Sequence, residues 1–221
     1  MDRTTAVAEI KRGLGFRQTQ DSSIILALQS AQRILETGRT LPDWLIEYDA
    51  EIVVTADDPE IVLPTGFLRM HDDYDMYYSN SNSARVFIPR KNYTEAYQAY
   101  VASGDEEDGH IEQPTSSYPK VWVQRSNEAA LLIPTPSVSF SMFLTYYKAA
   151  ELLTSNVENA WLKYAPDLII GLAGIKIAGP LRDKGALEVF STQYKMGQGS
   201  FMGQKVEDEL AGRGLVMGRN N

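Results

Sequence analysis

Two histidines and a run of carboxylates are the residues of this chain whose types could support catalysis or metal binding. His71 is followed by Asp72, Asp73 and Asp75, and imidazole and carboxylate groups are ligands that divalent cations accept. The segment lacks the regular ligand spacing and the turn glycine of a calcium loop, so we interpret it as a solvated turn. His110 lies in an acidic stretch and is interpreted as a surface residue. We therefore expect neither a metal site nor a cofactor.

The other motifs give little support for catalysis. The chain has no Gly-x-Ser-x-Gly sequence, no P-loop and no cysteine, which excludes a disulfide framework and a thiolate metal site. Residues 197–203 (GQGSFMG) resemble a dinucleotide fingerprint, but the third glycine is one residue late and a helical pattern precedes it. We predict that the protein is not an enzyme and has no catalytic residue. A hydrolase or carbohydrate-active domain that uses carboxylates such as Asp72, Asp73 or Asp75 remains the alternative.

The two ends of the chain have helical periodicity. Residues 5–12 form a short amphipathic segment, and Ile24, Leu28, Ala31 and Leu35 then follow one stripe of a longer helix. A third helix begins at Pro166, where small residues such as Gly171 and Gly174 are typical of a closely packed neighbour. The last helix has the clearest stripe, which consists of Leu187, Phe190, Tyr194, Gly197 and Phe201.

Between these ends the apolar period changes to two. Residues 52–55 and 61–63 flank the turn sequence 57–60 (DDPE), which predicts a hairpin. Further segments rich in Val, Ile, Tyr and Phe are predicted strands: 74–78, 84–88, 120–125, 129–133 and 139–147. A short helix is expected over residues 93–101.

The order helices, strands, helices predicts an α+β fold in which an antiparallel β region is inserted into a helical bundle. We expect a helical domain from residues 1–40 and 148–221. Residues 41–147 would form a β-rich domain with an exposed acidic loop at 103–117.

The net charge of -8 is unevenly distributed along the 221 residues. Residues 41–75 carry a net charge of -9 and residues 103–175 carry -5, whereas residues 1–40 and 176–221 carry +2 each. An acidic protein does not hold DNA through phosphate contacts, although an acidic surface also serves solubility alone. The apolar runs are too short to span a membrane, and the N-terminus lacks a secretory signal, so we expect a soluble protein made in the cytoplasm.

Tyrosines and a glycine-rich end indicate contacts with other proteins. Twelve tyrosines outnumber seven phenylalanines, and six tyrosines lie between residues 74 and 100. Tyrosine is enriched in protein interfaces, but it also fills the faces of β-sheets. Residues 211–221 (AGRGLVMGRNN) have no pattern that would hold them in place, so we expect a neighbouring chain to order them.

Three groups of segments, taken together in this order, resemble a known family. They are residues 63–69 (LPTGFLR); residues 133–136 (IPTP) with 143–148 (FLTYYK); and residues 159–162 (NAWL) with 166–173 (PDLIIGLA). With an amphipathic helix before them and a long helix after them, the chain resembles head-to-tail adaptor (connector) proteins of tailed bacteriophages, especially short-tailed ones. The resemblance extends over roughly residues 20–205.

The resemblance implies a structural virion protein in the neck or tail, made in the host cytoplasm. It implies a ring, expected to have twelve copies, that joins the portal protein to tail nozzle or tail fibre proteins. DNA would pass through the ring for packaging retention and ejection, without sequence-specific binding and with no membrane contact. The implied portal-binding residues are Phe190, Tyr194, Phe201, Leu215, Val216, Met217 and Arg219, and the expected tail-side residues are Tyr74, Tyr77, Tyr78 and Tyr97.

Overall fold

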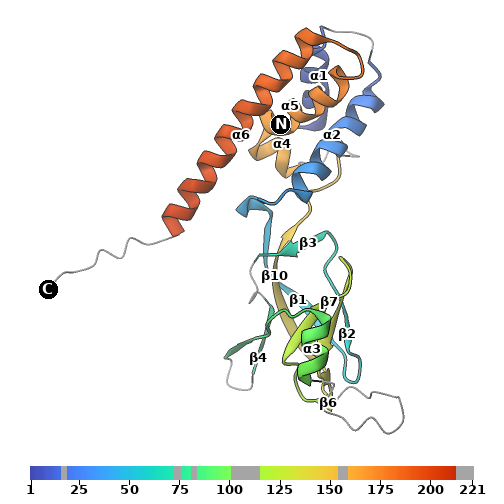
Figure 1. The fold of residues 1–221 in the computed structure, drawn as a ribbon, viewed down its shortest axis with the longest axis vertical. Helices are drawn as coiled ribbons and strands as arrows, with labels where there is room; N and C mark the ends of the chain where they lie inside the picture. The colour runs from blue at the N-terminus through green and yellow to red at the C-terminus, as the bar shows by residue number, and fades with distance from the viewer. Residues whose placement is uncertain (16–18, 72–75, 81–83, 101–114, 154–158, 213–221) are drawn as a thin grey trace, which may run out of the picture. The chain divides into compact units, whose positions relative to one another are not determined.

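A computed structural model describes residues 1–15, 19–71, 76–80, 84–100, 115–153 and 159–212 (Figure 1). The chain forms two compact units, one of Met1–Trp44 with Ala150–Asn221 and one of Leu45–Ala149. We call them the helical unit and the β unit. Helices and antiparallel sheets are both present, which confirms the predicted α+β class.

Five helices make up the described part of the helical unit: α1 (Arg3–Gly13), α2 (Asp21–Thr37), α4 (Ala160–Tyr164), α5 (Pro166–Ala178) and α6 (Lys184–Gly212). Side-chain caps begin two of them. Asp2 Oδ1 accepts a hydrogen bond from Thr5 N at 2.7 Å, and Asn159 caps α4 through Leu162 N. Hydrogen bonding from the Thr5 side chain, and then from its backbone N–H, lowers the pKa of Asp2. Pro166 opens α5, as predicted.

Helix α5 is the apolar centre of this unit. It packs against α2 on one side and α6 on another, and its Leu168, Ile169 and Ile170 are buried. The predicted stripe of α2 faces inward, since Ile24, Leu28 and Ala31 are all buried. Most of the circumference of α5 is apolar, as expected of a helix that contacts other helices on more than one side.

Helices α5 and α6 pack so closely that their backbones touch at two glycines. A Cβ atom placed at Gly171 would lie 2.6 Å from the backbone nitrogen of Tyr194, and one at Gly197 would lie 2.5 Å from Leu168 N. Real Cβ atoms do not approach backbone so closely, so only glycine fits at these positions. The close packing predicted from Gly171 and Gly174 is confirmed.

One carboxylate connects three segments of the helical unit. Glu36 of α2 accepts hydrogen bonds at Oε1 from Gln32 Nε2, from Ala150 N and from Trp161 Nε1, at 2.9, 3.0 and 3.1 Å. Gln32 also donates to Ala150 O at 2.9 Å. This network satisfies donors that burial would otherwise leave without partners.

The β unit contains ten strands and one helix among its described residues, with a 3-10 turn at Asp43–Leu45 where the chain enters it. Their bounds are β1 (Ile46–Val54), β2 (Glu60–Val62), β3 (Phe67–Met70), β4 (Met76–Ser79), β5 (Arg85–Phe87), α3 (Tyr93–Tyr100), β6 (Thr115–Ser116), β7 (Val121–Gln124), β8 (Ala129–Ile133), β9 (Thr135–Pro136) and β10 (Phe140–Lys148).

Strand β10 organises the larger sheet, whose order is β1-β10-β4-β5 with β3 also paired to β10. A second sheet has the order β2-β8-β7, and β6 pairs with β9 in parallel. Side chains from both larger sheets share one core, which includes Met142 and Leu144 from β10 with Trp122 and Leu132 from the second sheet. The opposite face of the second sheet packs Val121 and Val123 against Ala96 of α3.

The predicted hairpin around residues 57–60 is wrong. The turn is present, since Asp58 N donates to Thr55 O, but β1 pairs with β10 and β2 pairs with β8. Asp57 has φ 61° and donates its N–H to Pro136 O, so the chain leaves one sheet and enters the other. Alternating periodicity identifies a strand but does not identify its partner.

None of the described helices combines the length and the hydropathy that a bilayer crossing requires.

Candidate interaction surfaces

Phe190, one of the residues expected to bind a portal, lies in the core of the helical unit. Its side chain is 1% exposed. Its ring packs against Gly13 of α1 and Gly174 of α5, at positions where a Cβ atom would overlap the ring. We therefore correct the expectation for this residue, since a buried ring holds α1, α5 and α6 together and is unavailable to a partner.

Tyr194 and Phe201 follow Phe190 on the same inward stripe of α6 and are half-buried. The backbone of Tyr194 rests against Gly171, and the ring of Phe201 lies 6.3 Å from that of Trp161. Both are therefore only partly accessible to a partner. The other portal-binding candidates, Leu215, Val216, Met217 and Arg219, lie outside the described residues.

Exposed apolar side chains lie on both flanks of α6. Val189 and Met196 are 55% and 67% exposed on one flank, and Met202, which is 50% exposed, lies on the other. Cβ atoms at Gly199 and Gly203 would meet nothing within 4 Å. The flank with Val189 and Met196 was not predicted from the sequence. The signal that could have found it is the spacing of seven between Val189, Met196 and Gly203.

A groove of about 470 Å³ lies between α2 and the last turns of α5. Leu26, which is 64% exposed, and Leu181, which is 45% exposed, contribute apolar surface to it. Ser23 and Ser30 of α2 and Lys176 of α5 add polar groups. Leu26 falls outside the predicted α2 stripe, so its exposure follows from the helical period.

Two of the four tyrosines expected on the tail side are buried in the β unit. Tyr77 is 6% exposed and donates its hydroxyl to Asp49 Oδ1 at 2.8 Å, with the Arg85 guanidinium 4.5 Å from its ring centroid. Burial, and then the bond to Asp49, raise the pKa of Tyr77.

Tyr78 is 9% exposed and stacks on Tyr118 with ring centroids 4.5 Å apart, and burial raises its pKa. The expectation of direct contact is therefore corrected for Tyr77 and Tyr78, whose rings fill sheet faces. Tyr74 lies outside the described residues.

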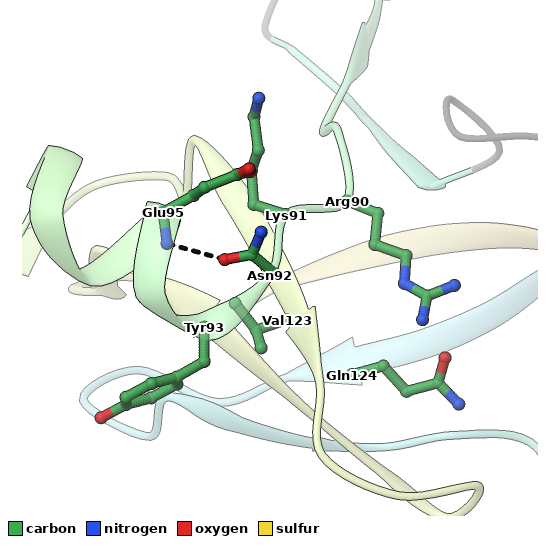
Figure 2. Close-up of a pocket in the computed structure, with 7 residues that line it drawn as sticks. All are labelled: Arg90, Lys91, Asn92, Tyr93, Glu95, Val123 and Gln124. Carbon is green, nitrogen blue, oxygen red and sulfur yellow. Dashed lines mark hydrogen bonds between the residues drawn. The ribbon is translucent and has the colours of Figure 1, made fainter.

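Tyr97 belongs to a different surface of the β unit. It is half-buried on α3 and stacks on Tyr93, which is 52% exposed, with centroids 6.0 Å apart. Tyr93 also lines a pocket of about 440 Å³ (Figure 2). The other lining residues are Arg90, Lys91, Asn92, Glu95, Val123 and Gln124.

Local structure fixes the shape of this pocket. Asn92 caps α3 by accepting a hydrogen bond from Glu95 N at 2.8 Å (Figure 2), and Lys91 N donates to Trp122 O. The Arg90 guanidinium lies 5.7 Å from the Trp122 ring centroid. Within the described ranges, no carboxylate is in ion-pair distance of Arg90 or Lys91. The pocket therefore presents two cations, one carboxylate and an exposed aromatic ring.

A family model for the SU10 adaptor protein matches residues 1–216. The chain belongs to the SU10 adaptor protein family. This is a family of bacteriophage head-to-tail adaptors, so the protein is a structural phage protein, and the resemblance to adaptors is confirmed. A search of curated proteins found no match.

Membership in this adaptor family supports a structural role over the hydrolase alternative. The carboxylates of that alternative, Asp72, Asp73 and Asp75, lie outside the described residues, as does His110. In the part of the chain that is described, no group of three His, Asp or Glu side chains could hold a metal ion. The described surfaces offer apolar, aromatic and cationic contacts, which suit protein partners.

Proposed function

We propose that this adaptor forms a ring that joins the phage portal to the tail and leaves a channel for DNA. The family match over residues 1–216 carries this proposal. The separation of the chain into a helical unit and a β unit supports it, because two compact units can serve two different partners. We propose twelve copies, on the resemblance of the sequence to connector proteins.

The portal side is assigned to the helical unit. The end of α6 and residues 213–221, which include Leu215, Val216, Met217 and Arg219, would dock on the portal. This segment carries two arginines and no acidic residue, and three consecutive apolar side chains supply contact area. Phe190 supports the docking helix from inside the unit.

The tail side is assigned to the β unit, at the pocket beside α3. Tyr93 and Tyr97 offer aromatic contact area, and Arg90 and Lys91 offer donors to carboxylates of a tail protein. Aromatic residues and arginine are enriched at protein interfaces. This surface replaces the buried Tyr77 and Tyr78 in the assignment.

DNA would pass the ring without being held. Residues 41–75 carry a net charge of -9, and such a surface repels phosphates instead of binding them. Retention and ejection of the DNA would then depend on the channel and on the tail below it.

The test uses the purified portal and tail components of the phage that encodes this chain. Negative-stain microscopy should show a ring of the full chain on the portal. A chain that ends at residue 212 should dock about tenfold more weakly, because the apolar and basic segment is lost. Tyr93→Ala with Arg90→Glu should leave portal docking unchanged and weaken attachment of the tail component.

Each of these experiments has an outcome that would contradict the assignment it tests. Full docking by the truncated chain contradicts the portal assignment of residues 213–221. Normal tail attachment by the Tyr93 and Arg90 variant contradicts the tail-side assignment. If the full chain forms no ring on the portal, the proposed function itself is wrong.

A further inference from the structure

The described residues of the helical unit leave one flank of α6 uncovered, the flank with Val189 and Met196. Phe190, Tyr194 and Gly197 turn one side of α6 toward α1 and α5. At 100° per residue, Val189 and Met196 lie about 100–120° around the helix from Phe190, on the flank that we call the outward face, and Gly199 at its edge lies opposite Phe190. Met196 is 67% exposed, and a Cβ atom at Gly199 would meet nothing within 4 Å. A partner helix could approach the backbone there closely.

The groove between α2 and α5 is a surface of the complementary kind. Leu26, Ile177 and Leu181 line it with apolar side chains, and no α6 residue with a described side chain lines it. Since the outward face of α6 points away from α5, it cannot reach this groove in the same chain. One helical unit therefore carries an apolar ridge and an apolar groove that do not meet.

Each of the two surfaces has a charged residue, and the two charges are opposite. Lys176 lines the groove and is half-buried, whereas Glu188 precedes Val189 on α6 and is exposed. Among the residues that the structure describes, neither side chain has an ion-pair partner. A ridge placed in a groove would bring a carboxylate with it toward this ammonium group.

We propose that the outward face of α6 in one copy of this chain occupies the α2–α5 groove of a second copy. A contact between two different surfaces of identical chains is heterologous, and it continues from copy to copy until it closes into a ring. This inference rests on the proposed ring function and identifies the surfaces that build the ring. Its ridge includes Met196 and Gly199, N-terminal to the segment assigned to the portal.

The absence of cysteine from the chain allows a direct cross-linking test. Leu26→Cys would be mixed with Met196→Cys, and a short bis-maleimide would be added in solution and on purified portal. One variant carries its cysteine in the groove and the other carries it on α6, so we expect a covalent dimer in the mixture. The double variant Leu26→Cys/Met196→Cys should give a ladder of higher oligomers.

The matched control is Tyr48→Cys in place of Met196→Cys. Tyr48 is 67% exposed, as Met196 is, but belongs to the β unit. Mixtures of Tyr48→Cys with Leu26→Cys should give no dimer above the background of random collision. Circular dichroism should show that all three variants retain the wild-type helix content, since each changed side chain is mostly exposed.

Charge reversal gives an independent arm. Lys176→Glu and Glu188→Lys should each lower the cross-linking yield several-fold, about fivefold for a pair of this exposure. The double reversal Lys176→Glu/Glu188→Lys should restore it, because the attraction is re-formed with opposite signs.

The outcomes separate this inference from the proposed function. Rings on the portal without the Leu26–Met196 dimer overturn the inference and leave the proposed function standing. Absence of rings on the portal overturns the proposed function. Failure of the double reversal to restore the yield overturns the assigned register.

Discussion

The helical unit and the β unit obtain their cores in different ways. In the helical unit, α5 and α6 meet where Gly171 and Gly197 leave no room for a methyl group, and Phe190 occupies the space left by two further glycines. In the β unit, two sheets share a cluster of alternating side chains in which Met142 and Leu144 are typical members. Backbone contacts cannot relax, whereas side chains can change rotamer, so the helical unit should tolerate far less change.

This difference can be measured because the tryptophans report on different units. Trp44 and Trp161 lie in the helical unit, where their rings pack edge to face at 4.8 Å, and Trp122 lies in the β unit. In a Trp122→Phe background, fluorescence during urea unfolding would follow the helical unit alone.

The largest effect is expected from Phe190→Ala. The change leaves a cavity between α1, α5 and α6, which should lower the free energy of unfolding of the helical unit by about 4 kcal/mol. The measurement is urea unfolding in the Trp122→Phe background. Val189→Ala, at a neighbouring position that is 55% exposed, is the control and should cost less than about 0.5 kcal/mol. Equal losses for the two variants would contradict the placement of Phe190.

Gly171→Ala should follow, with a loss of about 3 kcal/mol, because the new methyl group meets the backbone of Tyr194. Gly185→Ala is the matched control on α6. Its Cβ would lie 3.7 Å from Asp183 Oδ1, an ordinary contact, so alanine should stabilise by about 0.5 kcal/mol.

The comparable change in the β unit is Met142→Leu, which keeps the side-chain volume. It should cost less than about 1.5 kcal/mol, because neighbours in the cluster can adjust. A loss at Met142 as large as that at Gly171 would remove the contrast between the two units.

Tyr77→Phe should have a smaller effect, about 1 kcal/mol, because it removes one hydrogen bond to Asp49 and keeps the ring between its neighbours. Urea unfolding followed by Trp122 fluorescence measures it. Asp49→Asn retains a side-chain oxygen that can accept from Tyr77 and should cost less. A loss of several kcal/mol in Tyr77→Phe would mean that the hydroxyl has a further structural partner.

Alkaline pH should affect the β unit selectively. The pKa values of Tyr77, Tyr78 and Tyr146 are all raised above 10.0, chiefly by burial. A raised folded-state pKa means that stability is fully present below pH 10 and is lost as the pH rises through the folded-state values, because the unfolded chain releases its protons first. The free energy of unfolding of the β unit, followed by Trp122 fluorescence, should therefore fall above pH 10, and Tyr78→Phe should make that fall with pH less steep. If Tyr78→Phe leaves the pH dependence of stability unchanged, the raised pKa of Tyr78 is not its cause.

Local patterns in the sequence were sufficient for most elements. The stripe of Ile24 and Leu28 predicted α2, Pro166 predicted the start of α5, and β8 has the predicted bounds, residues 129–133. The small strands β6 and β9 and the strand β3 were not found. They are too short for a period to be recognised, and their partners are distant in sequence.

Surface assignments were less predictable than elements. Tyr77, Tyr78 and Phe190 were chosen for their residue type, but tyrosine and phenylalanine supply both cores and interfaces. The face of α6 with Met196 and the pocket with Arg90 depend on which side of each element is covered. A sequence contains no direct record of that coverage.

By itself the sequence determined the class of this protein, because periods of 3.6 and 2 depend only on neighbouring residues and the absence of motifs needs no structure. It also contains, in a particular order along the chain, the segments by which the adaptor family could be recognised. Only the tertiary structure decided that β1 pairs with β10 and not with β2, that Phe190 lies between two glycines and that Val189 and Met196 of α6 are exposed. These are contacts between residues far apart in the chain, and burial is set by the whole packed unit and not by any local pattern.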